Sequence, residues 1–132
     1  MILIDTNVLI DILSCDENWY SWSKAALVAR ATEGLLINEI VYAELAPQYG
    51  SQSALDDAIA EFDLIFERAP KSALFAAGRT FDAYRKRGGT RTSLLPDFFI
   101  GAHAATADIP ILTRDARRYQ TYFPEVALIA PE

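Results

Sequence analysis

Short apolar runs alternate with longer segments of mixed polarity along the chain. The runs at residues 2–4, 35–37, 64–66, 109–113 and 126–129 predict five short strands, the last of them at an edge. The segments between them predict helices over residues 8–13, 17–32, 39–46, 52–63, 71–87 and 98–106, with a short helix after Asp115. Because strands and helices alternate, the pattern favours an α/β fold with a largely parallel sheet covered by helices.

Composition narrows the class of protein. The chain has 132 residues, of which 52% are hydrophobic and 11% aromatic, so we expect one folded domain over residues 1–132. No apolar run reaches the ~18 residues of a membrane-spanning helix, and no basic segment precedes the first strand as in a signal peptide. Cys15 is the only cysteine. We therefore expect no internal disulfide, no membrane association and a cytoplasmic location.

The net charge of −6 is unusual for a protein that binds nucleic acid. One or two divalent ions on clustered carboxylates would change it to about −4 or −2, so a nucleic-acid substrate is not excluded. An acidic surface also predicts a basic partner.

Four acidic residues stand where a parallel sheet can bring them together. Asp5 and Asp115 follow the first and fourth apolar strands, and Asp97 begins a helix that is apolar all round. Glu44 lies beside the apolar face of its helix. The carboxyl ends of parallel strands share one edge of the sheet. Simpler roles remain open for two residues, since Asp5 can cap the following helix and Glu44 can border the apolar face with its stem buried.

Carboxylates that meet at one site need cations, because like charges a few ångströms apart repel strongly. Oxygen ligands without His or Cys are typical of Mg²⁺ or Mn²⁺ sites, and these ions commonly serve phosphoryl chemistry. His103 is six residues from Asp97, about 240° around the helix, so the two side chains do not share a face. We interpret His103 as a packed core or interface histidine rather than a catalytic base.

A basic segment follows the long helix over residues 71–87. Four of the twelve basic residues lie in it: Arg85, Lys86, Arg87 and Arg91. Two interpretations stay open. The cations suit the C-terminal end of a helix dipole, or they belong to a Gly-Gly loop that meets phosphates.

Four segments carry a family resemblance. They are Ile-Asp-Thr-Asn-Val-Leu-Ile (residues 4–10), Ile-Val-Tyr-Ala-Glu-Leu (40–45), Leu-Pro-Asp-Phe-Phe-Ile-Gly-Ala-His-Ala (95–104) and Leu-Thr-Arg-Asp (112–115). In this order they resemble the PIN-domain ribonucleases and, within them, the VapC toxins of type II toxin–antitoxin modules. The resemblance implies a three-layer α/β/α sandwich around a mostly parallel sheet of four to five strands. One departure is Asn38-Glu39, where we expect a small hydroxyl residue before Ile40.

The resemblance also implies an activity, a metal-dependent endoribonuclease. An acidic pocket would bind Mg²⁺ or Mn²⁺ and activate a water for in-line attack on phosphorus, leaving 5′-phosphate and 3′-hydroxyl ends. The pocket residues would be Asp5, Glu44, Asp97 and Asp115. Asn7 and Thr113 match accessory polar positions, and Thr113 would orient a carboxylate or a water.

Partners follow from the same resemblance. The substrate would be RNA, and its candidate contacts are Arg85, Lys86, Arg87, Arg91, Arg114 and Arg117. VapC-like proteins usually form homodimers, and their partner is a small DNA-binding, VapB-like antitoxin that inserts a basic or aromatic segment at the acidic pocket. Such a partner agrees with the acidic net charge.

The sequence leaves three alternative functions to consider. A phosphatase of the haloacid dehalogenase type would have a second aspartate two positions after the first, where this chain has Asn7. A response-regulator receiver needs a lysine after a late strand, and the only lysines are Lys24, Lys71 and Lys86. A PIN domain that binds RNA or a protein without cleavage is the third, and metal binding without cleavage of any RNA would favour it.

Overall fold

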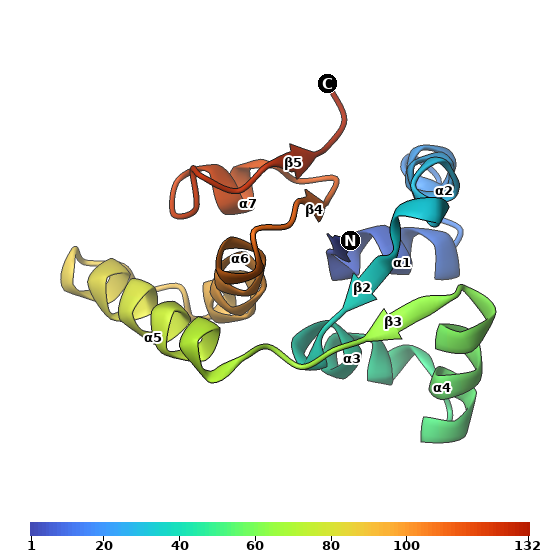
Figure 1. Cartoon of the computed structure of the whole chain (residues 1–132), viewed down its shortest axis with the longest axis horizontal. Coiled ribbons are helices and arrows are strands. Elements are labelled where there is room, and N and C mark those ends of the chain that lie inside the picture. Colours follow the sequence, from blue (N-terminus) through green and yellow to red (C-terminus); the bar gives the residue numbers. More distant parts are fainter.

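A parallel sheet of five strands forms the centre of the computed structural model, which describes residues 1–132 (Figure 1). The strands are β1 (Ile2–Ile4), β2 (Leu35–Ile37), β3 (Leu64–Phe66), β4 (Ile111–Leu112) and β5 (Leu128–Ile129). Their order is β3-β2-β1-β4-β5, and every neighbouring pair is parallel. β1 is therefore central and β5 lies at an edge, as the hydrophobic pattern predicts.

Helices cover both sides of the sheet. They are α1 (Thr6–Leu13), α2 (Tyr20–Ala29), α3 (Glu39–Leu45), α4 (Gln52–Glu61), α5 (Lys71–Lys86), α6 (Leu95–Ala107) and α7 (Arg117–Gln120). In Figure 1, α5 and α6 lie together on one side of the sheet, and α1, α2 and α4 lie on the other. The predicted three-layer α/β/α sandwich is confirmed.

Several element boundaries differ from the predicted ones, for local reasons. The helix expected over residues 17–32 begins only at Tyr20, because the Asp16 carboxylate accepts hydrogen bonds from the backbone N–H groups of Asn18 and Trp19 and forms a turn. The strand expected over residues 109–113 is shortened to Ile111–Leu112, since Pro110 has no N–H to donate. The helix expected over residues 98–106 begins three residues earlier, so Asp97 lies inside its first turn.

The register of β1 and β4 positions the site. Leu3 lies opposite Ile111 and Ile4 lies opposite Leu112, so the polar residues that follow both strands emerge side by side. All four apolar side chains are fully buried, which holds this edge rigidly in the core. None of the helices has the length and hydrophobicity needed to cross a membrane.

Candidate active site

Asp5 lies at the end of β1, beside Thr113 at the end of β4. The Asp5 backbone N–H donates to the carbonyl of Leu112 at 2.9 Å, and the Thr113 hydroxyl donates to Asp5 Oδ2 at 2.8 Å. Both side chains are buried, with Asp5 only 1% exposed. The Asp5 carboxylate makes no capping hydrogen bond to α1. Asp5 thus occupies the N-cap position of α1, while its carboxylate interacts with Thr113 instead of capping the helix.

The Thr113 hydroxyl is the centre of a small polar network. Besides donating to Asp5, it accepts a hydrogen bond from the Asp115 backbone N–H at 3.0 Å and one from Asn7 Nδ2 at 3.4 Å. The Asn7 side chain in turn accepts from the backbone N–H of Arg114 at 3.4 Å. Asn7 and Thr113 thus link the chain segments that carry Asp5 and Asp115.

Glu44 faces this edge of the sheet from α3. The Thr6 hydroxyl donates to Glu44 Oε1 at 2.7 Å, which holds the glutamate toward the start of α1. The side chain is exposed, and it lines the same cavity as Asp97 and Asp115. Glu44 therefore borders the cavity with a solvent-exposed side chain.

The amide of Asn38 explains why a hydroxyl residue is not needed before Ile40. Asn38 Oδ1 accepts hydrogen bonds from the backbone N–H groups of Ile40 and Val41 at 3.0 and 3.1 Å, so it caps α3 as a serine or threonine would. Its Nδ2 then donates to His103 Nδ1 at 3.1 Å. His103, a residue of α6, is buried where α6 packs against α3. Its interpretation as a packed interface histidine is therefore confirmed.

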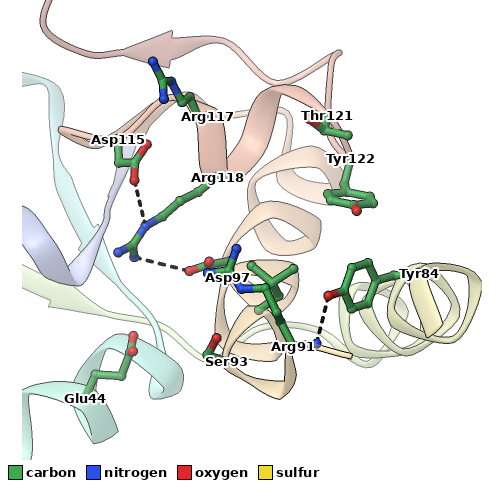
Figure 2. A pocket seen from close by; sticks show the side chains of 11 residues that line it. Glu44, Tyr84, Arg91, Ser93, Asp97, Asp115, Arg117, Arg118, Thr121 and Tyr122 are labelled. Atoms are coloured by element: carbon green, nitrogen blue, oxygen red, sulfur yellow. Dashed lines mark hydrogen bonds and ion pairs between the residues drawn. The ribbon is translucent and has the colours of Figure 1, made fainter. Parts of the chain in front are cut away.

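Arg118 lies between Asp97 and Asp115. Its Nη1 is 3.5 Å from Asp97 Oδ1, and its Nε is 3.3 Å from Asp115 Oδ2. Figure 2 shows the guanidinium reaching from α7 toward both carboxylates, with Glu44 on the far side. The positive charge of Arg118 therefore occupies the space between two of the four predicted acids.

The pKa of Asp97 indicates that the four carboxylates interact electrostatically. Burial raises the pKa of the Asp97 carboxyl from 3.8 to about 6, and the Arg118 cation offsets part of this rise. The charges of Asp5, Glu44 and Asp115 contribute a smaller part of the same rise. The protein thus keeps a carboxyl group where its ionised form is disfavoured unless a cation is near.

A polar cavity of about 560 Å³ opens over these acids. Its walls combine three carboxylates, three arginines and two tyrosines with smaller side chains (Figure 2). The charged members are Glu44, Asp97, Asp115, Arg91, Arg117 and Arg118. Asp5 lies behind this surface, in contact with Thr113. Acidic and basic groups on one wall are suited to a substrate that carries phosphates together with its cations.

Sequence reasoning missed two residues of this site, Arg118 and Tyr119. Tyr119 is fully buried, and its hydroxyl lies near the Asp5 carboxylate without forming a hydrogen bond of ordinary distance and angle. Burial, together with the charges of Asp5 and Asp97, raises the pKa of Tyr119 well above its ordinary value of 10. Both residues belong to the four-residue helix α7, and so short a helix has too few turns for its pattern to indicate which side faces the acids.

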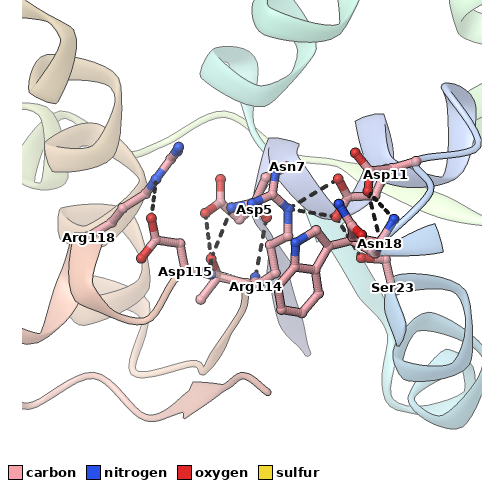
Figure 3. Close-up of polar contacts among 11 residues, drawn as sticks. Asp5, Asn7, Asp11, Asn18, Ser23, Arg114, Asp115 and Arg118 are labelled. Atoms are coloured by element: carbon pink, nitrogen blue, oxygen red, sulfur yellow. Dashed lines mark hydrogen bonds and ion pairs between the residues drawn. The ribbon is translucent and has the colours of Figure 1, made fainter. Parts of the chain in front are cut away.

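Arg114, predicted as an RNA contact, forms an ion pair with the buried carboxylate of Asp11. Its Nε is 2.8 Å from Asp11 Oδ2, and its guanidinium lies over the ring of Trp19. Asp11 is 2% exposed and also accepts a hydrogen bond from the Ser23 hydroxyl at 2.9 Å. In Figure 3, Arg114 extends toward Asp11 while the next residue, Asp115, turns toward Arg118. The Nε group of Arg114 is therefore committed to a structural partner, and a contact between its remaining N–H groups and RNA stays a prediction.

Two of the other predicted RNA contacts pack on their own helix. Arg85 lies over the ring of Phe81 with 5.9 Å to its centroid, and Lys86 forms an exposed ion pair with Asp82 at 3.0 Å. Arg85 and Lys86 occupy the last turn of α5, where cations suit the helix dipole. For these two residues the structural interpretation is sufficient.

The remaining predicted contacts lie at or near the cavity. Arg87 covers the ring of Tyr122, which lines the cavity, with 5.7 Å to its centroid. Arg91 and Arg117 line the cavity themselves and form no ion pair. The backbone N–H of Arg91 donates to the Tyr84 hydroxyl at 2.9 Å, which anchors the loop at the cavity wall.

The donor chemistry of the site fits a hard divalent ion. Asp5, Glu44, Asp97 and Asp115 supply only oxygen atoms, which Mg²⁺ and Mn²⁺ prefer. A cation, Arg118, already lies between two of them. No three of the acidic side chains lie close enough to share one ion in this arrangement. Binding an ion between Asp97 and Asp115 therefore requires side-chain movement, above all of Arg118.

Three solved structures resemble the chain over nearly its whole length. VapBC2 from Rickettsia felis, bound to a promoter DNA fragment, matches with a TM-score of 0.72 and 20% identity, covering 100% of both chains. A toxin–antitoxin complex from Klebsiella pneumoniae matches with a TM-score of 0.69 and 19% identity, covering 100% of this chain and 98% of that one. VapBC-1 from nontypeable Haemophilus influenzae matches with a TM-score of 0.69 and 18% identity, covering 98% of both. At this identity the matches show a common fold.

Sequence comparison adds the family. No curated protein is detectably similar to the chain. The family model described as "PIN domain", however, matches residues 2–124, which include all four acids and the strands and helices that position them. The chain therefore belongs to the PIN-domain family.

Proposed function

We propose that this PIN domain is a VapC-like toxin, a metal-dependent endoribonuclease that acts in the cytoplasm and is counteracted by a VapB-like antitoxin. One observation carries the proposal. The cavity wall places three carboxylates, Glu44, Asp97 and Asp115, beside two arginines without ion pairs, Arg91 and Arg117. Carboxylates suit the metal ion and arginines suit the phosphates of a nucleic-acid strand. Membership of the PIN-domain family supports nuclease chemistry at this place.

Each group of residues has a distinct task in this proposal. Asp5, Asp97 and Asp115 hold Mg²⁺ or Mn²⁺, and Thr113 orients the Asp5 carboxylate through its 2.8 Å hydrogen bond. Glu44 either contributes a ligand or holds the water that attacks phosphorus. A bound divalent ion supplies neutralisation of the phosphate charge and activation of that water. Cleavage leaves 5′-phosphate and 3′-hydroxyl ends.

Arg91 and Arg117 bind phosphates on either side of the cleaved bond. Neither side chain is committed to a carboxylate of the protein, in contrast to Arg114. The loop that carries Arg91 is anchored by the Tyr84 hydroxyl, so its position over the cavity is defined. Basic side chains that contact the backbone make binding dependent on salt and largely independent of sequence.

The partner proposal depends on charge. A net charge of −6 and an acidic cavity are complementary to a basic segment of an antitoxin. One of the three similar structures is named as a toxin–antitoxin complex, and the other two are named VapBC2 and VapBC-1. We also propose a homodimer, and analytical ultracentrifugation of the isolated chain would measure that state directly.

The decisive experiment is an RNA cleavage assay with mapped ends. Purified protein is incubated with total RNA and Mg²⁺ or Mn²⁺, with EDTA as the first control. The Asp5→Asn, Asp97→Asn double variant removes two carboxylates of the site, and Asp57→Asn changes an exposed acid of α4 that is remote from it. We expect discrete cuts with 5′-phosphates from the wild type and the Asp57 variant only.

Two other outcomes would contradict this proposal. Metal binding without cleavage of any RNA, in protein free of antitoxin, would instead support a PIN domain that binds RNA or a protein without cutting it. Cleavage that persists in EDTA and in the double variant would exclude these carboxylates as its source.

A further inference from the structure

Arg118 is the only basic side chain that forms an ion pair with any of the four acids. It contacts two of them at once, Asp97 at 3.5 Å and Asp115 at 3.3 Å. The two carboxylates come from distant parts of the chain, the first turn of α6 and the turn before α7. A single guanidinium thus joins two segments that carry predicted metal ligands.

The other arginines of this region are placed differently. Arg114 is committed to Asp11 on the opposite side of the β4 turn (Figure 3). Arg117 and Arg91 line the cavity without an ion pair. Arg117 is the immediate neighbour of Arg118 on α7 and is also exposed, so it offers a matched comparison.

A metal ion and the Arg118 guanidinium need the same oxygen atoms. An ion bound by Asp97 and Asp115 would lie next to a full positive charge if Arg118 kept its place, and like charges at that range repel strongly. The side chain of Arg118 is 40% exposed, so it has room to leave through the cavity. The Arg118 side chain therefore has space to move away when the ion binds, and charge repulsion requires that it does so.

We propose that Arg118 is a built-in counter-ion of the metal-free site, which competes with the divalent ion for Asp97 and Asp115 and is displaced when that ion binds. This inference rests on the proposed function, because it assumes that these carboxylates bind metal. Arg118 holds the two acids together before metal arrives, and it weakens apparent metal affinity by the free energy of its own ion pairs. It acts through the ligands and is a positioning residue.

Mn²⁺ binding by the metal-free chain tests this competition without any measurement of cleavage. Isothermal titration calorimetry is performed on the wild type, Arg118→Gln, Arg118→Lys and Arg117→Gln. Arg118→Gln should bind Mn²⁺ about tenfold more tightly, the effect expected when one partly screened charge is removed from beside an ionic site. Arg118→Lys keeps the charge and should stay near the wild-type affinity. Arg117→Gln should change the affinity by less than about twofold, because its charge is exposed and screened.

A second measurement uses the unaltered protein, so it does not depend on whether a variant folds. The Nε–H signal of Arg118 in a ¹⁵N NMR spectrum reports its contact with Asp115. Titration with diamagnetic Mg²⁺ should shift this signal toward that of a solvated arginine, while the Arg117 signal, which has no such contact, stays nearly unchanged.

Several outcomes would overturn the inference. Equal or weaker Mn²⁺ binding by Arg118→Gln, or an Arg118 signal unaffected by saturating Mg²⁺, would mean that Arg118 has only a structural role. If the wild type nevertheless cleaves RNA in a metal-dependent way, the proposed function stands and only the competition is rejected. If the wild type binds no Mn²⁺ at all, both the competition and the metal dependence are rejected together.

Discussion

The Thr113 hydroxyl donates a hydrogen bond to the carboxylate of Asp5 at 2.8 Å, although the two residues are 108 positions apart in the sequence. Both side chains are buried, so this carboxylate depends on a protein donor instead of water. The same hydroxyl accepts a hydrogen bond from the Asp115 backbone at 3.0 Å. One threonine therefore sets the relative position of two predicted metal ligands.

Replacing Thr113 should weaken metal binding and stability together. Thr113→Val leaves the Asp5 carboxylate without its donor, which should lower the free energy of unfolding by about 1–3 kcal/mol and Mn²⁺ affinity by about 10–100-fold. Urea denaturation and calorimetric titration measure the two effects. Thr113→Ser keeps the hydroxyl and is the control. Unchanged Mn²⁺ affinity in Thr113→Val would show that the hydrogen bond does not position a ligand.

Substitution of Arg114 should affect mainly stability, whereas substitution of Arg117 should affect mainly RNA binding. Arg114→Ala leaves the buried Asp11 carboxylate without its cation, so we expect the free energy of unfolding to fall by about 3 kcal/mol. Arg117→Ala removes an exposed charge and should change stability by less than about 0.5 kcal/mol while weakening RNA binding. Denaturation curves and fluorescence anisotropy at fixed salt measure the pair. A stable Arg114→Ala protein would contradict the ion pair with the buried Asp11 carboxylate.

Burial of the Tyr119 hydroxyl should lower the free energy of unfolding, and removal of the hydroxyl should relieve this destabilisation. Tyr119→Phe keeps the fully buried ring and deletes an oxygen that forms no hydrogen bond of ordinary distance and angle. We expect the melting temperature to stay equal or to rise, with a gain of up to about 1 kcal/mol in the free energy of unfolding. Thermal melts in EDTA check this expectation. A loss of more than about 1 kcal/mol would instead indicate that the hydroxyl has a partner, either the nearby Asp5 carboxylate or a buried water.

Asp97 predicts an unusual pH dependence for the metal-free protein. Its folded pKa of about 6 lies above the ordinary 3.8, so the folded chain binds more protons than the unfolded chain between these values. Stability from this group is therefore present below pH 4 and is lost as pH rises to about 6. Asp97→Asn should be more stable than the wild type at pH 8 by about 2 kcal/mol, after allowance for solvent screening. The difference should vanish near pH 3.5 in melts with EDTA; equal stability at pH 8 would contradict the raised pKa.

His103 should act in the opposite direction. Burial lowers the pKa of His103 below its ordinary 6.5, and Nδ1 is the acceptor for Asn38 Nδ2, so the folded chain favours the neutral ring. The unfolded chain binds the extra proton first as pH falls below about 6.5, so this group lowers stability on acidification. His103→Gln keeps an acceptor but cannot titrate, and its stability should fall less than that of the wild type from pH 7 to pH 5. Identical pH profiles would show that the ring titrates normally.

The local hydrophobic pattern alone predicted the strands and the placement of several site residues. The apolar runs predicted all five strands. Of these, β1, β2 and β4 are buried along their whole length, and a strand buried on both faces is continuously hydrophobic whatever its neighbours are. The same runs predicted that Asp5 and Asp115 emerge at one edge of the sheet if their strands are neighbours, and β1 and β4 are neighbours. Asp97 and His103 were assigned to an apolar helix from spacing, and both are buried there.

Only the tertiary structure decided which charges pair. Arg114 and Arg118 lie one residue before and three residues after Asp115, yet Arg114 pairs with Asp11, 103 residues away, and Arg118 pairs with both Asp115 and Asp97. Sequence analysis assigned Arg114 to RNA and omitted Arg118, because side-chain direction in the β4 turn and in so short a helix depends on packing. The hydrophobic pattern specifies which residues are buried, whereas the partner of a buried charge is set by strand order and helix docking.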